Sequence, residues 1–336
     1  MNNKTAVLLV NLGTPDSPSV SDVRSYLSQF LNDPRVIDIP WLFRKLLVNV
    51  IIVPFRAPKS AKVYQKLWTK DGSPLLHYSE MAKGLLQQEL GDTHDVYLAM
   101  RYKNPSIPDV LEVIRRKNYP RIVVLPMFPQ YASATTGSAH DEIMRIVRKW
   151  WVIPELRFIS QYYAHPLYLE AFAERGRKYN IKDYDHVLFS YHGLPERQVD
   201  KVYDEGLCSD HDCEKGITEE NKFCYKATCY ETTRRLAKLL EIRETEYTVC
   251  FQSRLDKKWL TPFSDRVVED CARKGMKKIL VFSPAFTADC LETIIEIGDE
   301  YQEIFHKLGG EKVQLVESLN DHPLWIKCLK DLVTTA

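Results

Sequence analysis

Short apolar runs recur along the 336-residue chain, separated by stretches in which apolar residues follow a helical period. Eight of the runs are continuous and rich in Val, Ile, Leu and Phe, which is typical of strands buried on both faces of a parallel sheet. These predicted strands are Ala6–Asn11, Asp95–Met100, Arg121–Phe128, Leu156–Ser160, Asp185–Tyr191, Glu246–Gln252, Lys278–Ser283 and Val313–Ser318. Helical stretches such as Met81–Glu89 and Tyr230–Leu240 lie between them. The pattern therefore predicts α/β units with right-handed crossovers.

The predicted strands fall into two sets of four with similar spacing. Their first residues are 6, 95, 121 and 156, and then 185, 246, 278 and 313, so each set has one long interval followed by two shorter ones. We therefore predict two similar doubly wound halves, residues 1–165 and 166–320, with residues 321–336 forming a C-terminal helix that packs back. Because ligands of open α/β sheets bind beyond the carboxyl ends of the strands, we expect the two sets of ends to face one central cleft.

Composition and charge narrow the classes of function. The 46 Lys and Arg residues nearly balance the 45 Asp and Glu residues, so no field of one sign is available to bind nucleic acid in general. The chain lacks the glycine-rich nucleotide motifs GxGxxG and GxxxxGK[ST], and it lacks the GxSxG motif. These absences disfavour a dehydrogenase, a P-loop enzyme and an α/β-hydrolase. The N-terminal apolar run AVLLV is too short for a secretory signal, which predicts a cytoplasmic protein.

The most apolar stretch covers residues 36–55 but contains Asp38, two basic residues and two prolines, so it cannot span a bilayer. Two interpretations of Trp41–Leu47 remain open. The segment forms a helix that faces the core, or it forms an exposed apolar lip, flanked by Arg44, Lys45 and Arg56, that contacts a membrane or a large flat ligand.

One histidine and one carboxylate occupy positions suited to acid–base chemistry. His192 comes directly after the fifth predicted strand and is followed by a glycine, and an imidazole at such an edge can accept a proton near neutral pH or bind a metal. Glu292 opens the helical stretch after the seventh strand, and Glu296 lies one turn further along the same face. Most acidic stripes are solvated helix faces, but the position of Glu292 in the first turn predicts that it faces the cleft. Together these groups suit proton removal and the handling of a metal ion.

Four of the eight cysteines lie within 22 residues, with the spacing Cys208-x4-Cys213-x10-Cys224-x4-Cys229. Thiolates this close in sequence can close around one metal centre. Zinc remains open as the metal, although the x4 spacing favours an iron–sulfur cluster, and His211 could replace one of the cysteines. Cys250, Cys271 and Cys328 are expected to be small core residues.

Several motifs together resemble the ferrochelatases, the enzymes that insert Fe²⁺ into protoporphyrin IX to make protohaem. The matching stretches, in family order, are NLGTPDSP, GSPLLHYS, VVLPMFPQYASATTG, SYHGLPER, FQSR and PAFTADCLETIIEI. They run from residue 11 to about residue 300 and so cover nearly the whole chain. Each is weak alone, but six in order are highly specific.

The resemblance implies two Rossmann-like halves with the porphyrin held between them. It implies that His192 and Glu292 are catalytic, and that these two residues, joined by Glu296, meet the substrate Fe²⁺. Trp41–Leu47 resembles the apolar lip through which the macrocycle enters, which allows peripheral contact with the inner membrane. The matching positions along the porphyrin pocket are Arg56, Tyr64, Ser73, Arg101, Tyr102 and Trp259.

Some members of the family carry a [2Fe-2S] cluster, and this chain has an insertion, residues 200–229, relative to compact bacterial members. The resemblance therefore implies a [2Fe-2S] cluster on Cys208, Cys213, Cys224 and Cys229. Two alternatives stay open: a tetrapyrrole or metal carrier, or iron–sulfur sensor, without catalysis, and a chelatase for coproporphyrin or another metal. The sequence does not distinguish a monomer from a homodimer.

Overall fold

The computed structural model describes residues 4–336, which divide into two compact units. The first unit comprises the chain up to Phe128 together with Ala132–Ser160 and Ile326–Ala336. The second comprises Pro129–Tyr131 and Gln161–Trp325. The last helix, α12 (Pro323–Thr334), begins in the second unit and ends in the first.

Each unit contains one four-stranded sheet in which every pair of neighbouring strands is parallel. In the first, β1 (Thr5–Gly13), β2 (His94–Tyr102), β3 (Arg121–Pro126) and β4 (Glu155–Phe158) lie in the order β2-β1-β3-β4. In the second, β5 (His186–His192), β6 (Tyr247–Gln252), β7 (Lys278–Phe282) and β8 (Lys312–Leu315) lie in the order β6-β5-β7-β8. The eight predicted strands and the two similar α/β halves are therefore confirmed.

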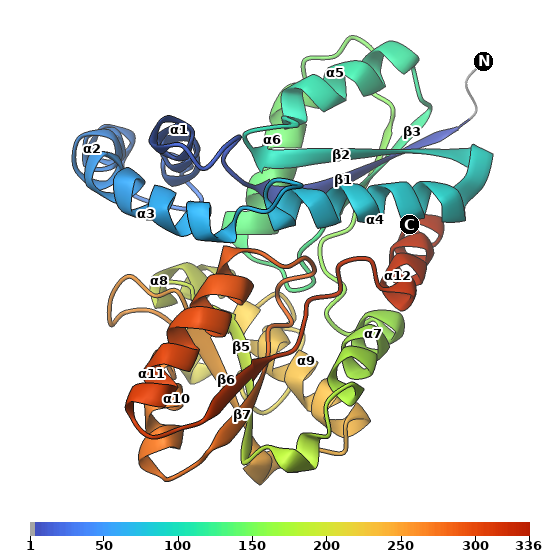
Figure 1. Cartoon of the computed structure of the whole chain (residues 1–336). Coiled ribbons are helices and arrows are strands. Elements are labelled where there is room, and N and C mark those ends of the chain that lie inside the picture. The colour runs from blue at the N-terminus through green and yellow to red at the C-terminus, as the bar shows by residue number, and fades with distance from the viewer. Residues whose placement is uncertain (1–3) are drawn as a thin grey trace. The chain divides into compact units, whose positions relative to one another are not determined.

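Helices cover both faces of the first sheet, which explains its continuous apolar strands. Figure 1 shows α4 (Pro74–Leu90) along one face, and α5 (Ile107–Lys117) and α6 (Ser138–Val147) on the other. Alternate residues of β1, among them Leu8 and Val10, pack with Leu111 of α5 and Ile143 of α6, and all four are completely buried. A strand covered in this way needs an apolar residue at every position.

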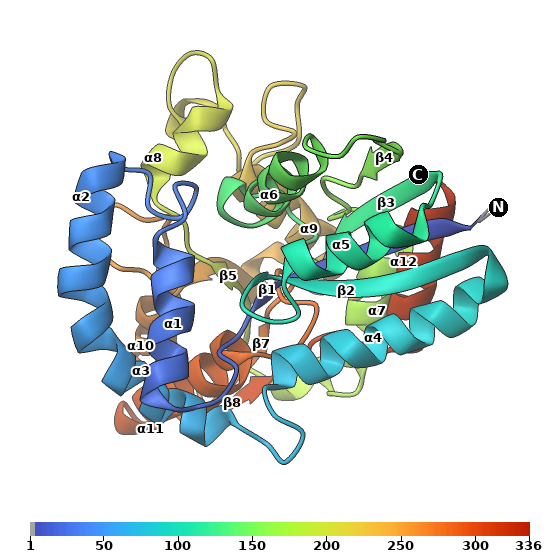
Figure 2. The same ribbon diagram turned by 90° about the horizontal axis from the view of Figure 1, so that it is seen from above.

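Helices α1 (Val20–Leu31) and α3 (Val53–Leu67), with the π-helical η1 (Leu47–Ile52), form a separate packed group joined to the carboxyl end of β2. Their shared core contains Val23, Val53, Ala57 and the last residue of β2, Tyr102. In Figure 2 these helices run side by side, with α2 (Trp41–Leu46) continuing the line of α3. The group thus extends the first unit at the edge where its strands end.

The surface of this helical group settles the question left open for the apolar segment. Four of its five large apolar side chains are exposed, Trp41, Leu42, Phe43 and Leu46, and only Leu47 is half-buried. The exposed surface continues through Val50, Ile51 and Phe55. We call these seven exposed residues the apolar lip. No helix among residues 4–336 is long and apolar enough to cross a membrane.

One expected basic neighbour of the lip is absent from its surface. The side chain of Arg44 is buried, and its guanidinium donates hydrogen bonds to the carbonyl oxygens of Ile37 and Ile39, at 3.3 and 2.8 Å. The prediction that Arg44 flanks the lip is therefore wrong, because its charge satisfies the backbone of the preceding turn. Arg56 is exposed and Lys45 is half-buried.

The second sheet is covered by α7 (Pro166–Arg177) and α9 (Tyr225–Leu239) on one face, and by α10 (Ser264–Arg273), the π-helical η8 (Glu292–Tyr301) and α11 (Gln302–Lys307) on the other (Figure 1). Val281 of β7 packs in one cluster with Val268 of α10, Ile297 of η8 and Phe305 of α11. The remaining helical turns are η2 (Gly91–Thr93), η3 (Ser133–Gly137), η4 (Ile181–Asp183), α8 (Glu196–Val199), η5 (Asp200–Val202), η6 (Cys208–Asp210) and η7 (Glu244–Glu246).

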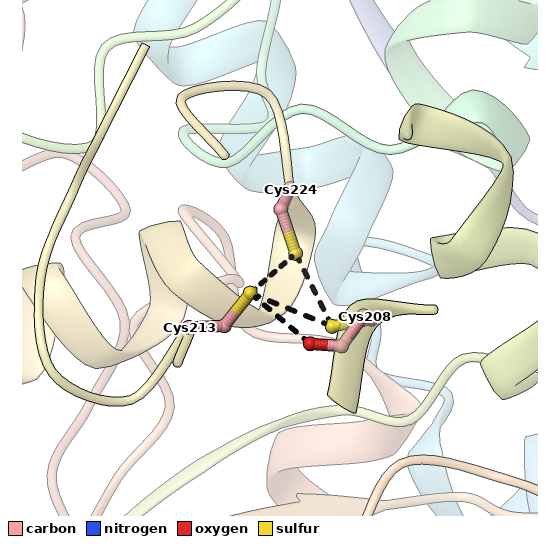
Figure 3. A group of neighbouring side chains, drawn as sticks. All are labelled: Cys208, Cys213 and Cys224. Carbon is pink, nitrogen blue, oxygen red and sulfur yellow. Dashed lines mark hydrogen bonds between the residues drawn. The ribbon is translucent and has the colours of Figure 1, made fainter. Parts of the chain in front are cut away.

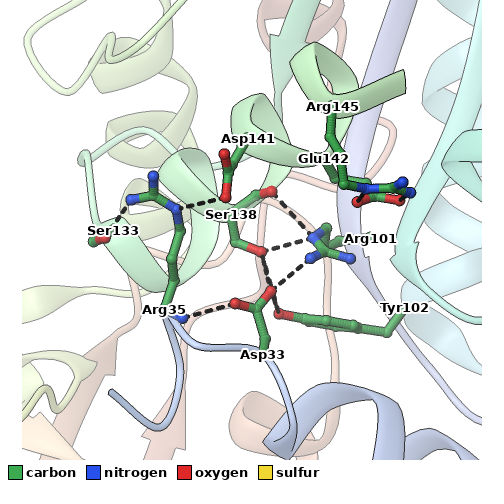
Figure 4. Close-up of polar contacts among 9 residues, drawn as sticks. All are labelled: Asp33, Arg35, Arg101, Tyr102, Ser133, Ser138, Asp141, Glu142 and Arg145. Atoms are coloured by element: carbon green, nitrogen blue, oxygen red, sulfur yellow. Dashed lines mark hydrogen bonds and ion pairs between the residues drawn. The ribbon is translucent and has the colours of Figure 1, made fainter. Parts of the chain in front are cut away.

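A buried ion pair joins three segments at the carboxyl edge of the first sheet (Figure 4). Asp33, just beyond α1, accepts hydrogen bonds on Oδ2 from Arg101 of β2 at 2.6 Å, from the Ser138 hydroxyl of α6 at 2.6 Å and from the Tyr102 hydroxyl at 3.0 Å. Burial, and then the Asp33 carboxylate, raise the pKa of Tyr102, so its hydroxyl stays a donor. The network fixes the loop after α1 and the start of α6 to the end of β2.

We predict that Asp33→Asn destabilises the protein by about 3 kcal/mol, because it removes a buried carboxylate and leaves the charge of the half-buried Arg101 without its partner. The matched control is Asp141→Asn, which breaks the exposed ion pair of Asp141 with Arg35 at 3.3 Å. We expect that change to cost about 0.5 kcal/mol or less. Urea unfolding followed by circular dichroism measures both, and equal losses for the two variants would contradict this role for Asp33.

Candidate functional site

His192 is the last residue of β5, and a hydrogen bond to a carbonyl group fixes which of its ring nitrogens is protonated. Nδ1 lies 2.6 Å from the carbonyl oxygen of Gly193. A carbonyl oxygen only accepts, so Nδ1 carries the proton, and Nε2 of the neutral ring carries a lone pair. The ring is half-buried, with the rings of Trp259 and Phe286 each centred 6.4 Å from its own. The arrangement leaves His192 able to accept a proton or bind a metal through Nε2.

Gly193 is required by the close approach of two neighbouring segments. A Cβ atom at this position would lie 2.8 Å from the carbonyl oxygen of Gln252 and 3.2 Å from Cε3 of Trp259. The backbone N–H of Gly193 donates to that same carbonyl oxygen at 2.7 Å. The glycine therefore allows the turn after His192 to pack directly against the end of β6.

The side chain of Gln252, the residue paired with His192 across β5 and β6, extends this connection to the acidic helix. Its Nε2 donates to the carbonyl oxygen of Glu292 at 2.9 Å and to Oε2 of Glu296 at 3.2 Å. Its Oε1 accepts from the hydroxyl of Ser190 at 2.7 Å. Gln252 is buried, and it ties the segment of His192 to the first turn of η8.

Glu292 and Glu296 share one face of η8 but have different surroundings. Glu292 is half-buried at the first position of η8, and its carboxylate interacts with the thiol of Cys290. Burial, and then this carboxylate, raise the pKa of Cys290 well above its usual value, so the thiol stays protonated as a donor. The more distant acids Asp299, Glu300 and Glu303 are exposed, as expected of a solvated stripe.

Glu296 is held by three donor groups from two other residues besides Gln252. Its carboxylate accepts from the backbone N–H of Ser253 at 2.9 Å, from the Ser253 hydroxyl at 2.5 Å and from the Tyr301 hydroxyl at 3.0 Å. Ser253 has a φ of 62°, in the left-handed region, and these bonds hold it there. Four hydrogen bonds use most of the acceptor capacity of one carboxylate. Glu296 is thus better placed to fix the Ser253 turn than to bind metal, and its predicted metal contact stays a prediction.

The residues predicted to contact the porphyrin differ in their solvent exposure. Arg56 is exposed, and Tyr64, Arg101 and Trp259 are half-buried. Ser73 is buried, and its hydroxyl has no hydrogen-bond partner among residues 4–336. The guanidinium of Arg101 donates hydrogen bonds to Asp33 and Ser138. The side chain of Tyr102 has no exposed surface. These two residues hold together the segments at the carboxyl end of β2, and their direct contact with a ligand stays a prediction.

Three of the four clustered cysteines point their sulfurs toward one another (Figure 3). The Sγ atom of Cys208 lies 3.6 Å from those of Cys213 and Cys224, which are 3.7 Å apart. With metal–sulfur bonds of about 2.3 Å, two thiolates on one tetrahedral ion lie about 3.8 Å apart. The spacing therefore fits three thiolate ligands of a metal centre. Cys229, five residues further along α9, is buried, but its sulfur does not belong to this group.

Proton sharing among the three thiols favours one thiolate. Cys224 precedes the first residue of α9, and the hydrogen bonds it receives from Cys208 and Cys213 lower its pKa to about 3. The same interactions, with burial, raise the pKa of Cys208. A thiol group that releases a proton this readily is suited to binding a cation.

The turn around the sulfurs contains one residue that motif reasoning did not assign, Tyr203, beside His211. The Tyr203 hydroxyl lies 2.8 Å from Sγ of Cys213, and the ring of His211 stacks on the ring of Tyr203. His211 is not in the sulfur group, so it does not take the place of a cysteine there.

Gln252 and Ser253, at the end of β6, were recognised from the sequence only as part of the FQSR stretch. The available signal was a polar pair directly after a buried strand, where parallel sheets place their ligands.

Comparison with known proteins assigns the chain to a family. A family model described as Ferrochelatase matches residues 4–336. Ferrochelatase of Coxiella burnetii (strain Dugway 5J108-111) is 44% identical over 332 residues, which cover 98% of this chain and 92% of that protein. Ferrochelatase of Legionella pneumophila (strain Lens) is 44% identical over 331 residues, covering 98% of both chains.

Solved structures with a similar fold are more distant in sequence. SirB from Bacillus subtilis with Fe³⁺ has a TM-score of 0.56 at 12% identity, covering 98% of this chain and 94% of that one. The sirohydrochlorin chelatase SirB from Bacillus subtilis subspecies spizizenii in complex with cobalt has a TM-score of 0.54 at 13% identity, with the same coverage. These two likenesses concern the fold alone. The family match over residues 4–336, together with 44% identity over nearly the whole length, shows that the chain belongs to the ferrochelatase family.

Proposed function

We propose that this protein inserts Fe²⁺ into protoporphyrin IX to give protohaem, with release of two protons. The observation that carries the proposal is the similarity to proteins named Ferrochelatase along the whole chain. The geometry at the carboxyl edge of the second sheet supports it, because Gln252, paired with His192 across β5 and β6, donates from its buried amide to the backbone carbonyl oxygen of Glu292.

The residues of this edge suit the chemistry of metal insertion. Two pyrrole N–H protons must leave the macrocycle as the metal enters, so a base is needed near the ring nitrogens. We assign that role to His192, whose Nδ1–H is engaged by Gly193 and whose Nε2 carries the lone pair. Glu292 supplies a half-buried carboxylate that can hold the arriving Fe²⁺ or pass on a proton. The exposed guanidinium of Arg56 suits a propionate group.

The apolar lip is the second element of the proposal. Seven exposed apolar side chains on α2, η1 and α3 form a surface of the kind that contacts a membrane or a flat apolar ligand. Exposed basic residues beside it, Arg56 and Lys59, suit an anionic lipid surface. We therefore propose peripheral contact with the inner membrane of an otherwise cytoplasmic protein.

We further propose that Cys208, Cys213 and Cys224 are three ligands of a [2Fe-2S] cluster, with Cys229 as the fourth. The proposal is supported by the meeting of the first three sulfurs and by Cys229, the next buried thiol along α9. Because each iron of a [2Fe-2S] cluster binds two thiolates, the proposal requires the three sulfurs to separate when the cluster binds. Such a cluster can transfer one electron at a time. Insertion of Fe²⁺ involves no net electron transfer, so we assign the cluster a structural or iron-sensing role.

Anaerobic incubation with Fe²⁺ and protoporphyrin IX tests the activity through the absorbance of the haem formed. We predict turnover by the wild type and a rate about 10²- to 10⁴-fold lower for His192→Ala, since a positioned base is lost. His186→Ala is the matched control, because His186 lies at the opposite end of the same strand and bonds Thr248. We expect it to retain turnover within a few-fold.

No turnover by the wild type, or full turnover by His192→Ala, would defeat the catalytic assignment. A wild type that binds the porphyrin without forming haem would favour a tetrapyrrole carrier. Coproporphyrin III assayed in parallel identifies the tetrapyrrole, and faster turnover of that substrate would replace protoporphyrin IX in the proposal.

Metal and sulfide analysis of the purified protein tests the cluster. We expect a brown protein with about two irons and two inorganic sulfides per chain, and Cys213→Ser should lose the colour because one ligand is removed. Cys229→Ser should lose it as well if that residue is the fourth ligand. Cys250→Ser is the control, since Cys250 is buried in the core beside β5. A colourless protein containing one zinc ion would exclude the cluster.

A further inference from the structure

Tyr203 and His211 form a stacked pair against the sulfur group. The two rings are parallel within 7°, with their centroids 3.9 Å apart. The Tyr203 hydroxyl lies 2.8 Å from Sγ of Cys213 and also interacts with the sulfur of Cys224. Neither aromatic residue belongs to the group of three sulfur ligands, so the role of the pair differs from that of the cysteines.

The direction of the hydrogen bond follows from the chemistry of metal binding. A cysteine binds a metal as its thiolate, which has no proton to donate. In the metal-loaded protein Sγ of Cys213 can only accept, so the phenol of Tyr203 must be the donor. A hydrogen bond to an ionised acceptor is roughly twice as strong as one between neutral groups.

Several contacts hold the Tyr203 hydroxyl in position. The backbone N–H of Tyr203 donates to the carbonyl oxygen of Asp200 at 3.0 Å, and the side chain of Asp200 accepts from the backbone N–H of Cys208 at 2.8 Å. His211 is itself fixed, with Nδ1 3.3 Å from the Glu220 carboxylate and Nε2 3.2 Å from the carbonyl oxygen of Glu205. The imidazole of His211 is therefore held in place, and the phenol ring of Tyr203 stacks on it.

We propose that Tyr203 donates a hydrogen bond to the thiolate of Cys213 and thereby raises the reduction potential of the bound cluster, with His211 as the residue that positions the phenol. The inference rests on the [2Fe-2S] cluster proposed above. Reduction adds negative charge that spreads onto the ligand sulfurs, so a donor at a sulfur stabilises the reduced form more than the oxidised form. The pair would set the potential at which the cluster responds.

The test is a redox titration of the cluster in purified holoprotein, followed by its visible absorbance and by electron paramagnetic resonance. For Tyr203→Phe we expect a more negative midpoint potential. A threefold change in the reduction equilibrium corresponds to a shift of about 30 mV, at 59 mV per tenfold for one electron. Tyr184→Phe is the matched control, because it removes a phenol hydroxyl in the same unit that is not bonded to a cysteine, and its potential should equal that of the wild type.

A second pair of variants tests whether His211 positions the phenol ring of Tyr203. His211→Ala should shift the potential in the same direction as Tyr203→Phe, because the phenol loses its support. His211→Phe should restore the wild-type value, because another flat ring takes the place of the imidazole. In resonance Raman spectra, the iron–sulfur stretching bands of the wild type should move on transfer to D₂O by more than those of Tyr203→Phe.

The outcomes distinguish this inference from the cluster proposal. A wild type without iron and sulfide overturns the cluster and the role of Tyr203 together. A wild type with the cluster whose potential is unchanged in Tyr203→Phe overturns the role of Tyr203 alone. Loss of the cluster from folded Tyr203→Phe also overturns it, since the phenol would then be a ligand or a structural requirement and not a tuning donor.

Discussion

The buried carboxamide of Gln252 is the interaction on which the candidate site depends. It lies at the end of β6, beside His192 at the end of β5, and donates to both Glu292 and Glu296 at the start of η8. A parallel sheet brings its strand ends to one edge, but it does not set the height or orientation of a helix that begins beyond that edge. Gln252 fixes the position of that helix, and Glu296 in turn accepts hydrogen bonds that fix the Ser253 turn.

In the first unit, an ion pair fixes the segments that lie at the strand ends. There the carboxyl end of β2 is joined to the segments on either side by the ion pair of Asp33 and Arg101, with hydroxyl groups completing the shell of Asp33. Both edges use a side chain with several partners to fix separate segments. The neutral amide does so where an imidazole and carboxylates are gathered, and the ion pair does so where the surrounding core is apolar.

The fold could be predicted from the sequence because both faces of each sheet are covered, so the strands contain continuous apolar runs. His192 was recognised because it directly follows a buried run, and Glu292 because it opens the helix after the seventh strand. Three features were not recognised: the burial of Arg44, the use of Arg101 by Asp33, and the linking role of Gln252. Each depends on contacts between segments distant in the sequence, to which periodicity is insensitive. The spacing of the cysteines indicated a metal centre, but not that three sulfurs would meet while Cys229 stayed apart.

The claim that Gln252 aligns the two reactive groups is tested most directly by the steady-state rate of haem formation in Gln252→Leu. Leucine fills similar space without hydrogen bonds, so the bonds of residue 252 to the Ser190 hydroxyl and to the carbonyl oxygen of Glu292 are lost. The account predicts at least about a tenfold lower kcat, because the start of η8 loses its bond to the strand end beside His192. Far-ultraviolet circular dichroism and the unfolding transition report whether the variant remains folded. A folded Gln252→Leu protein with the kcat of the wild type would contradict the account.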